Sequence, residues 1–364
     1  MKKTYPIILP AMLMGGCMTN SHDTASHKSD ITGNDHPNVL FIAVDDLRDW
    51  TGYLGEYSVV QTPNLDKLAE AGMVFSNAHC AAPVCSPSRT ALLTGISPAN
   101  TGVYENGNRW EGDLREHVTL TRYFMDMGYY VAGFGKIYHG SGDLQYWHRF
   151  EYGEYSPAPK NPEHPAAFGS PLDIPDSLTG DWKRVSNAID ILEKDIHSPL
   201  FLACGIVRPH TPWDVPRKYF EMYPLDSIKL PEVKENDRED LPFIGKAIAG
   251  RKMGDNYGDY RAEWTHRQIV DSGLWKINIQ AYLASISYAD DQIGRLLEAW
   301  NSSRYAENGL IVLWGDHGWH LGEKQHWSKR TLWEAGTRTP LIFSYPGKIE
   351  EGSIMMDLKN EFIM

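Results

Sequence analysis

Cysteine is scarce in this chain, which has 4 cysteines among 364 residues. Cys17 and Cys85 each lie in a motif that gives them another role, so Cys80 and Cys204 remain as disulfide candidates. Cys204 lies in the apolar run Leu200–Ile206, where a buried strand thiol is the expected role. We therefore expect no structural disulfide.

Positive charge is also scarce: 35 lysines and arginines face 47 aspartates and glutamates, which gives a formal net charge of -12. This balance argues against nucleic acid as a partner and gives no general attraction to any anionic polymer. Any attraction to such a polymer must be local. No internal repeat is visible, and a hydrophobic content of 42% with 12 Trp and 19 Tyr predicts a large core.

The apolar run at the amino terminus, Ile7–Met14, is too short for a stable transmembrane helix. Lys2-Lys3 precede it and Gly15-Gly16-Cys17 follow, and small residues before a cysteine resemble the lipobox of bacterial lipoproteins. We predict a signal peptide over residues 1–17, lipidation of Cys17, and a polar tether over residues 18–37. The protein would then be an exported lipoprotein of the bacterial cell envelope, in the periplasm or at the outer membrane. An ordinary cleaved secretion signal is the alternative.

Two buried-strand patterns each end at acidic residues. The apolar run Asn38–Val44 leads into Asp45-Asp46, and Leu310–Trp314 leads through Gly315 into Asp316-His317. In open α/β sheets, ligands bind at the carboxyl ends of the strands, so these side chains should meet at one edge. Taken alone, a pair such as Asp45-Asp46 is more often part of a loop or a helix cap. The two patterns together predict a site for a divalent cation.

Strand and helix signals alternate along most of the chain. This alternation predicts an α/β fold with a mostly parallel central sheet and helices on both faces. Two stretches, residues 141–178 and 213–272, break the alternation and are expected to shape the mouth of the site. The predicted helices lie over Pro63–Ala71, Thr119–Met127, Val185–Leu192 and Lys276–Trp300, and the further strands over Tyr130–Phe134, Leu200–Ile206 and Pro340–Tyr345.

The sequence Cys85-Ser86-Pro87-Ser88-Arg89 resembles the signal that formylglycine-generating enzymes oxidise, and it makes the chain similar to a type I sulfatase. The segment from Ser86 to Gly95 predicts the start of a helix, which would place Arg89 one turn beyond Cys85. A helix start with an ordinary buried thiol is the alternative interpretation. In the family, one hydroxyl of the hydrated aldehyde attacks sulfur, and the other later expels sulfate as the aldehyde re-forms.

The resemblance narrows to the iduronate-2-sulfatase branch of the alkaline phosphatase superfamily and spans residues 38 to about 348. The segments that carry it occur in the family's order and with similar spacing. They are Val39–Trp50, Cys85–Gly95, Gly133–His139, Arg208–Pro212 and Gly315–Lys329.

The resemblance implies a role for each matched side chain. One Ca²⁺ ion is held by Asp45, Asp46, Asp316, His317 and the formylglycine (3-oxoalanine) made from Cys85. Arg89 and Lys136 hold the hydrate and the sulfate, and His139 takes the proton of the hydrate. Lys329 and His210 lie on the ester side, where His210 protonates the leaving oxygen. Calcium prefers oxygen ligands, so an indirect role for His317, or a different metal, stays open.

These observations predict a sulfuric ester hydrolase that acts on a sulfated glycan or oligosaccharide, with a 2-sulfated uronate as one candidate. A formylglycine-generating maturation enzyme is the implied partner. A phosphonate monoester or phosphodiester hydrolase is one alternative, and an inactive, truncated glycan-binding lipoprotein is another. Trp110, Trp213 and Trp319 could stack on sugar rings or pack in the core.

The carboxyl end departs from the family pattern. The catalytic domain is predicted to cover residues 38–350, and residues 351–364 to form an atypical or truncated C-terminus. Relatives usually continue into a smaller domain with an antiparallel sheet and a packed helix.

Overall fold

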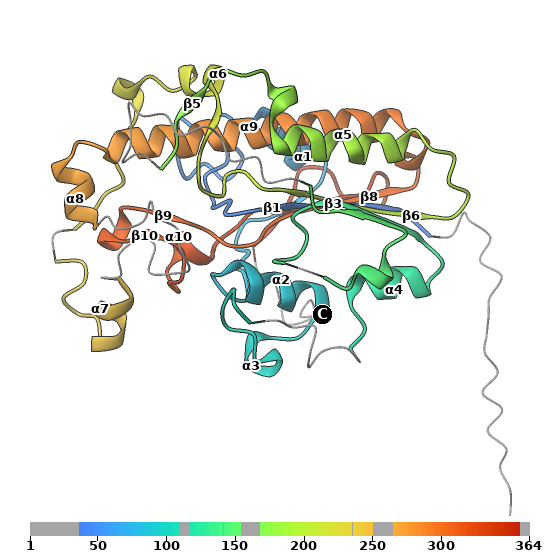
Figure 1. Ribbon diagram of the computed structural model, residues 1–364, viewed down its shortest axis with the longest axis horizontal. Helices are drawn as coiled ribbons and strands as arrows, with labels where there is room; N and C mark the ends of the chain where they lie inside the picture. The colour runs from blue at the N-terminus through green and yellow to red at the C-terminus, as the bar shows by residue number, and fades with distance from the viewer. Residues whose placement is uncertain are drawn as a thin grey trace, which may run out of the picture.

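The computed structural model describes residues 36–108, 117–140, 142–153, 168–234, 236–249 and 265–356. Its framework is a twisted central sheet (Figure 1). Within the described ranges this sheet has eight strands, in the spatial order β12, β2, β11, β8, β1, β6, β3, β4. The strands are β1 (Asn38–Val44), β2 (Met73–Phe75), β3 (Tyr130–Gly135), β4 (Arg149–Glu151), β6 (Leu200–Ile206), β8 (Gly309–Gly315), β11 (Leu341–Ser344) and β12 (Ser353–Met355).

The centre of the sheet is parallel. Strand β1 lies between β6 and β8 and is parallel to both, with Val44 level with Ile206 on one side and Gly315 on the other. Strand β3 continues the parallel arrangement, whereas β11 runs antiparallel to β8. Every residue of β6 is buried, as is every residue of β1 after the first, which explains their continuous apolar sequences. The predicted mixed α/β fold with a mostly parallel sheet is confirmed.

Helices cover both faces of the sheet (Figure 1). Helices α1, α5 and α9 lie on one face, and α2, α3 and α4 lie on the other. The helices are α1 (Pro63–Glu70), α2 (Cys85–Thr94), α3 (Pro98–Thr101), α4 (Leu120–Asp126), α5 (Gly180–Leu192), α6 (Arg217–Glu221), α7 (Phe243–Ala249), α8 (His266–Asp271), α9 (Trp275–Ser302) and α10 (Glu334–Thr337).

Helix α9 is the longest described helix and extends the predicted range by one residue at its start and two at its end. It packs against α1, α5 and α6, and it supplies much of the larger hydrophobic core. A second apolar cluster fills the opposite face, under α2 and α4. No helix in the described part of the chain has both the length and the apolarity that crossing a bilayer requires.

The stretches that break the alternation contain only short elements where they are described. These short elements are η1 (Leu144–Tyr146), β5 (Pro171–Leu172), η2 (Asp176–Leu178), β7 (Val215–Pro216) and η3 (Leu225–Ser227), together with β4, α6, α7 and α8. Directly before β8 lies η4 (Arg304–Ala306). Between β8 and β11 lie β9 (His320–Leu321), η5 (Glu323–Gln325) and β10 (Trp327–Ser328), in addition to α10.

The three-residue strands β2, β4 and β12 were not predicted, because three residues are too few to show a period. Strand β12 lies in the stretch predicted as an atypical C-terminus, and it pairs in parallel with β2 at the edge of the main sheet. The predicted signal peptide, Cys17, nearly all of the tether, and Trp110 lie outside the described residues.

Two of the tryptophans considered for sugar stacking belong to the core. Trp213 is fully buried and Trp319 is 3% exposed, and their rings meet edge to face at 5.9 Å. Neither ring is available to a ligand in this structure. Cys204 is buried in β6 as expected, and both Cys204 and Cys80 are free thiols within the described part of the chain.

Candidate active site

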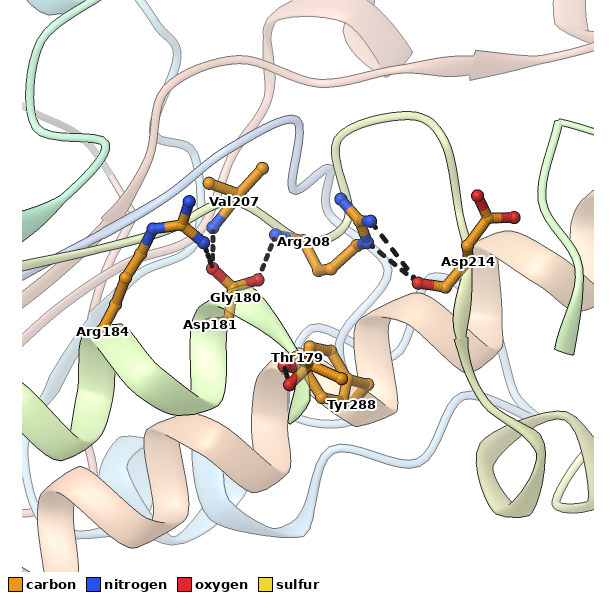
Figure 2. A pocket seen from close by; sticks show the side chains of 8 residues that line it. All are labelled: Thr179, Gly180, Asp181, Arg184, Val207, Arg208, Asp214 and Tyr288. Carbon is orange, nitrogen blue, oxygen red and sulfur yellow. Dashed lines mark hydrogen bonds and ion pairs between the residues drawn. The ribbon is translucent and has the colours of Figure 1, made fainter. Parts of the chain in front are cut away.

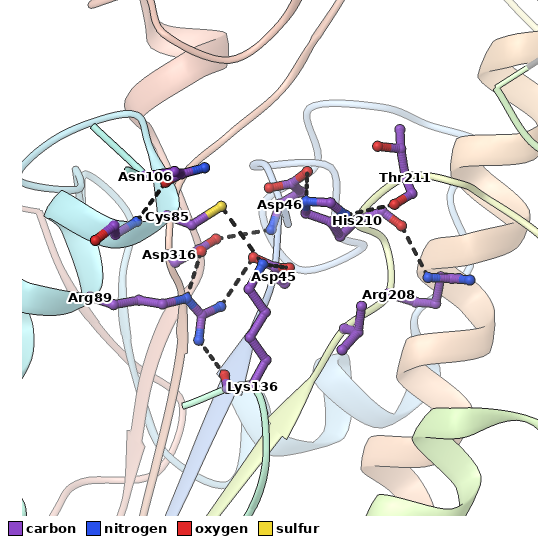
Figure 3. A network of polar contacts seen from close by, with 12 residues as sticks. Asp45, Asp46, Cys85, Arg89, Asn106, Lys136, Arg208, His210, Thr211 and Asp316 are labelled. Carbon is purple, nitrogen blue, oxygen red and sulfur yellow. Dashed lines mark hydrogen bonds and ion pairs between the residues drawn. The ribbon is translucent and has the colours of Figure 1, made fainter. Parts of the chain in front are cut away.

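The carboxyl ends of the central strands gather the predicted site residues. Strand β1 leads into Asp45 and Asp46, β3 into Lys136, and β8 into Asp316 and His317. Cys85 and Arg89 enter from α2, whose first turn points at this edge, and His210 follows β6 (Figure 3). The predicted meeting of separate strand ends is therefore present in the structure.

A group of potential metal ligands lies at the centre. Each of five residues offers one potential ligand atom, and these five atoms all lie within 4.8 Å of one another. The residues are Asp45, Asp46, Cys85, Asp316 and His317. All of them are buried. This separation suits side chains that share one ion.

The chemistry of this group fits a divalent cation. Asp46 Oδ2 is buried and has no hydrogen-bond partner among the described residues, which is costly for a carboxylate oxygen unless an ion binds it. His317 Nδ1 donates to Gly318 O at 3.0 Å, so its Nε2 faces Asp46 Oδ1 at 3.2 Å and Cys85 Sγ at 3.3 Å. Carboxylate oxygens with one imidazole nitrogen form a reasonable set of ligands.

Cationic side chains neutralise these carboxylates. Arg89 Nε donates to Asp316 Oδ2 at 2.8 Å, and its Nη2 donates to Asp45 Oδ1 at 3.2 Å. Lys136 forms an ion pair with Asp45, and Lys329 Nζ lies 2.7 Å from Asp46 Oδ1. Removing one member of such a buried pair typically costs about 3–5 kcal/mol, because the remaining charge stays desolvated.

The pKa values reflect burial and these pairs. Burial raises the pKa of Asp316 to about 6 even though Arg89 opposes the shift. Burial acts in the same direction on Asp45, but Lys136 holds the pKa of that carboxyl well below its usual range. Burial would lower the pKa of His317, yet Asp316 raises it to about 9. His317 must therefore lose a proton before its Nε2 can bind a cation.

Cys85 is the first residue of α2 and its side chain is fully buried. Its Sγ lies 3.0 Å from Lys329 Nζ, 3.3 Å from His317 Nε2 and 3.7 Å from Lys136 Nζ. Burial alone would raise the pKa of the thiol, but Lys136, Lys329 and His317 hold it well below its ordinary value. The position therefore favours an anionic group.

Two histidines complete the set. The side chain of His210 is 25% exposed, its Nδ1 donates to Thr211 O at 2.6 Å, and its Nε2 lies 3.9 Å from Asp46 Oδ2. Because Nδ1 is held by a carbonyl, Nε2 is the nitrogen that can exchange a proton at the site. His139 follows β3 and helps to lower the pKa of Cys85, and its buried Nδ1 has no partner among the described residues.

The loop that carries His210 is anchored beside a small cavity of about 40 Å³ (Figure 2). Asp181, in the first turn of α5, accepts hydrogen bonds from the backbone N–H of Val207 at 2.9 Å and of Arg208 at 3.0 Å. The Arg208 guanidinium in turn donates to His210 O at 3.2 Å. These contacts hold the backbone on which the imidazole depends.

Two supporting residues of the site were not predicted from the sequence. Asp181 is one of them, and Asn106 is the other: its Oδ1 accepts from the backbone N–H of Ser86 at 3.0 Å and so caps the helix that begins at Cys85. Both act on backbone groups far away in the sequence. The helix predicted over Val185–Leu192 began too late to include Asp181, and an acidic residue near a helix start is too common to single it out.

Several solved hydrolase structures share this fold. A phosphonate monoester hydrolase from Silicibacter pomeroyi aligns over 88% of this chain and 70% of its own, with a TM-score of 0.71 and 21% identity. A second structure, solved with D-glucosamine-2-N,6-O-disulfate as its substrate, gives a TM-score of 0.67, 21% identity, and coverage of 88% and 73%. At this level of identity the likeness shows that the mixed α/β fold with its mostly parallel sheet is shared with known hydrolases.

The sequence comparisons are more specific. The sulfatase family model matches residues 37–363, so this chain belongs to the sulfatase family. A sulfatase from Formosa agariphila is 36% identical over 92% of this chain and 69% of its own length. Human iduronate 2-sulfatase is 31% identical over 93% of this chain and 64% of its own. The chain thus spans about two thirds of these relatives.

Proposed function

We propose that this protein hydrolyses sulfate esters of carbohydrates, with a formylglycine derived from Cys85 as the nucleophile. The observation that carries the proposal is the position of Cys85, which begins α2 against Lys136, Lys329 and His317 at the carboxyl edge of the sheet. Membership of the sulfatase family supports the reaction type. The relative solved with a disulfated glucosamine supports the substrate class.

Conversion of Cys85 removes its sulfur and oxidises its β-carbon to an aldehyde, so it requires a maturation enzyme that brings its own oxidant. Formylglycine, as its hydrate, supplies the attacking hydroxyl and a second hydroxyl whose deprotonation releases sulfate. Lys136, Lys329 and Arg89 provide positive charge around this position, which favours both a nucleophilic oxygen and a bound sulfate. Because the overall charge is -12, an anionic sulfate ester is attracted by these nearby side chains and not by the protein as a whole.

Comparison of sulfate and phosphate esters tests the reaction type. We expect the matured protein to cleave an aryl sulfate faster than the matching aryl phosphate monoester or phosphonate monoester. Cys85→Ala should abolish turnover, because alanine cannot become an aldehyde, while the circular dichroism spectrum is unchanged. Faster cleavage of the phosphorus esters would favour the alternative hydrolase, and normal turnover by Cys85→Ala would refute the nucleophile. Binding of sulfated glycan without any turnover would favour a binding protein.

We also propose that the resident ion is a single Ca²⁺ ion, held by Asp45, Asp46, Asp316, His317 and the modified Cys85. A bound divalent cation would stabilise negative charge that develops on the sulfate oxygens. The unpartnered Oδ2 of Asp46 is the feature of this site that most needs a cation. The nitrogen of His317 is the feature least typical of calcium.

Calorimetric titration with Ca²⁺ and with Mg²⁺ tests this assignment. We expect tighter binding of Ca²⁺, and we expect Asp46→Asn to weaken it by about tenfold or more, because an amide carries no charge. Asp226→Asn, at an exposed aspartate in η3, is the matched control and should bind as the wild type does. Equal affinity in Asp46→Asn and the wild type would contradict the ligand set, and tighter Mg²⁺ binding would contradict the choice of ion.

The histidines are proposed to move protons. His139 is placed to take the proton of the formylglycine hydrate, and His210 to protonate the leaving oxygen through Nε2. Geometry supports His210, because its Nδ1 is fixed by Thr211 O and the imidazole lies at the partly exposed side of the site. Lys329 Nζ contacts both Cys85 Sγ at 3.0 Å and Asp46 Oδ1 at 2.7 Å, and Asp46 is the carboxylate that His210 faces.

Replacement of His210 should affect substrates unequally. His210→Ala should lower kcat by about a hundredfold or more on a sugar sulfate, whose alkoxide leaving group needs a proton. On an aryl sulfate with an acidic phenol the loss should be much smaller, because that phenolate leaves without protonation. The measurement is kcat on both substrates for both proteins. Equal losses on the two substrates would rule out His210 as the general acid.

For location, we propose an exported lipoprotein anchored through Cys17, on the basis of the basic, apolar and small residues that precede this cysteine. Lipidation would tether the catalytic domain through the polar residues that follow. Cys17→Ser should move the protein from the membrane fraction to the soluble fraction. An unchanged distribution would favour an ordinary secretion signal.

A further inference from the structure

Asp46 holds an unusual backbone conformation for a residue at the centre of the site. Its φ is 59°, in the left-handed region that non-glycine residues rarely adopt. Such a conformation persists when the surroundings fix both peptide groups of the residue. The N–H of Asp46 donates to Asp316 Oδ1 at 2.9 Å, and this bond fixes the peptide group before Asp46. Its carbonyl needs a partner of its own.

That partner is Tyr282, in the first half of α9. Its Oη donates to Asp46 O at 2.7 Å and accepts from the backbone N–H of Arg48 at 3.2 Å. One hydroxyl thus bridges the carbonyl of Asp46 and the N–H of Arg48, two residues further along the segment that follows β1. The side chain is fully buried, and α9 is a long helix packed against several others, so the hydroxyl is held rigidly.

The ring of Tyr282 supports the other half of the site. It meets the ring of Trp213 edge to face at 5.2 Å, and Trp213 Nε1 donates to Pro209 O at 2.6 Å, directly before His210. Trp50 packs on the same ring at 6.0 Å. A single side chain therefore contacts both the turn that carries Asp46 and the loop that carries His210.

We propose that Tyr282 is a positioning residue that sets the direction of the Asp46 carboxylate and thereby the affinity of the site for its cation. The inference rests on the metal site of the proposed function. Without the hydroxyl, Asp46 O and Arg48 N–H lose their shared partner, and the backbone of Asp46 can relax from φ of 59°. Asp46 would then present its oxygens to the cation in a less favourable direction.

Tyr305 provides a matched control, because its hydroxyl makes the same pair of bonds elsewhere. It donates to Lys194 O and accepts from the backbone N–H of Ile196 at 3.2 Å, again bridging residues two apart. Tyr305 is 2% exposed and lies just before β8, at the opposite end of that strand from Asp316. Tyr305→Phe and Tyr282→Phe therefore remove equivalent bonds from equally buried sites.

Calorimetric titration of Ca²⁺ into both variants, together with their urea unfolding, tests the proposal. We expect both variants to lose comparable stability, whereas only Tyr282→Phe should bind Ca²⁺ about tenfold more weakly than the wild type. Its kcat should approach the wild-type value as Ca²⁺ is raised to saturation. Wild-type affinity in Tyr282→Phe would overturn the positioning role. A wild-type protein that binds no divalent cation would instead overturn the proposed metal site.

A third variant separates the two bonds of the hydroxyl. 4-Aminophenylalanine at position 282 keeps a donor for Asp46 O but is a poor acceptor for Arg48 N–H. We expect it to recover most of the Ca²⁺ affinity, since the contact with Asp46 is the one that the proposal requires. Weak binding by this variant would contradict the proposal, and the comparison remains decisive even if Tyr282→Phe does not fold.

Discussion

The structure depends on keeping several carboxylates ionised in a place from which water is almost excluded. Asp45, Asp46 and Asp316 are completely buried, and burial alone would favour their neutral forms. Arg89, Lys136 and Lys329 supply the charge that balances them. Every other feature of the site can be understood as a way of holding these opposite charges together.

The fold meets this requirement with rigid elements. Parallel strands β1 and β8 deliver the aspartates side by side, β3 delivers Lys136, and α2 delivers Arg89 one turn beyond Cys85. Because each group begins at the end of a buried strand or helix, none depends on a long flexible loop. The cations that balance the carboxylates also surround Cys85, so the arrangement that permits buried aspartates also favours an anion at the nucleophile position. In our proposal, the aspartates bind the metal cation, and the lysines and the arginine bind the sulfate ester.

The sequence was informative wherever a pattern was long or chemically rare. The apolar runs that became β1, β6 and β8 predicted the parallel centre of the sheet, and the motif at Cys85 predicted the family. The structure brings together the predicted catalytic and metal-binding residues, whose individual roles remain proposals. The strands of three residues, β2, β4 and β12, left no period to detect. Asn106, Asp181 and Tyr282 escaped notice because they act on backbone groups distant in the sequence, and no local pattern encodes such contacts.

The central claim is that Cys85 is the precursor of the nucleophile. The most direct test is the mass of the peptide that contains it, taken from protein that turns over a sulfate ester and was produced together with a formylglycine-generating enzyme. The account predicts an aldehyde in place of the thiol, in a fraction of molecules that rises with specific activity. Full activity in protein whose Cys85 is entirely an unmodified thiol would contradict it.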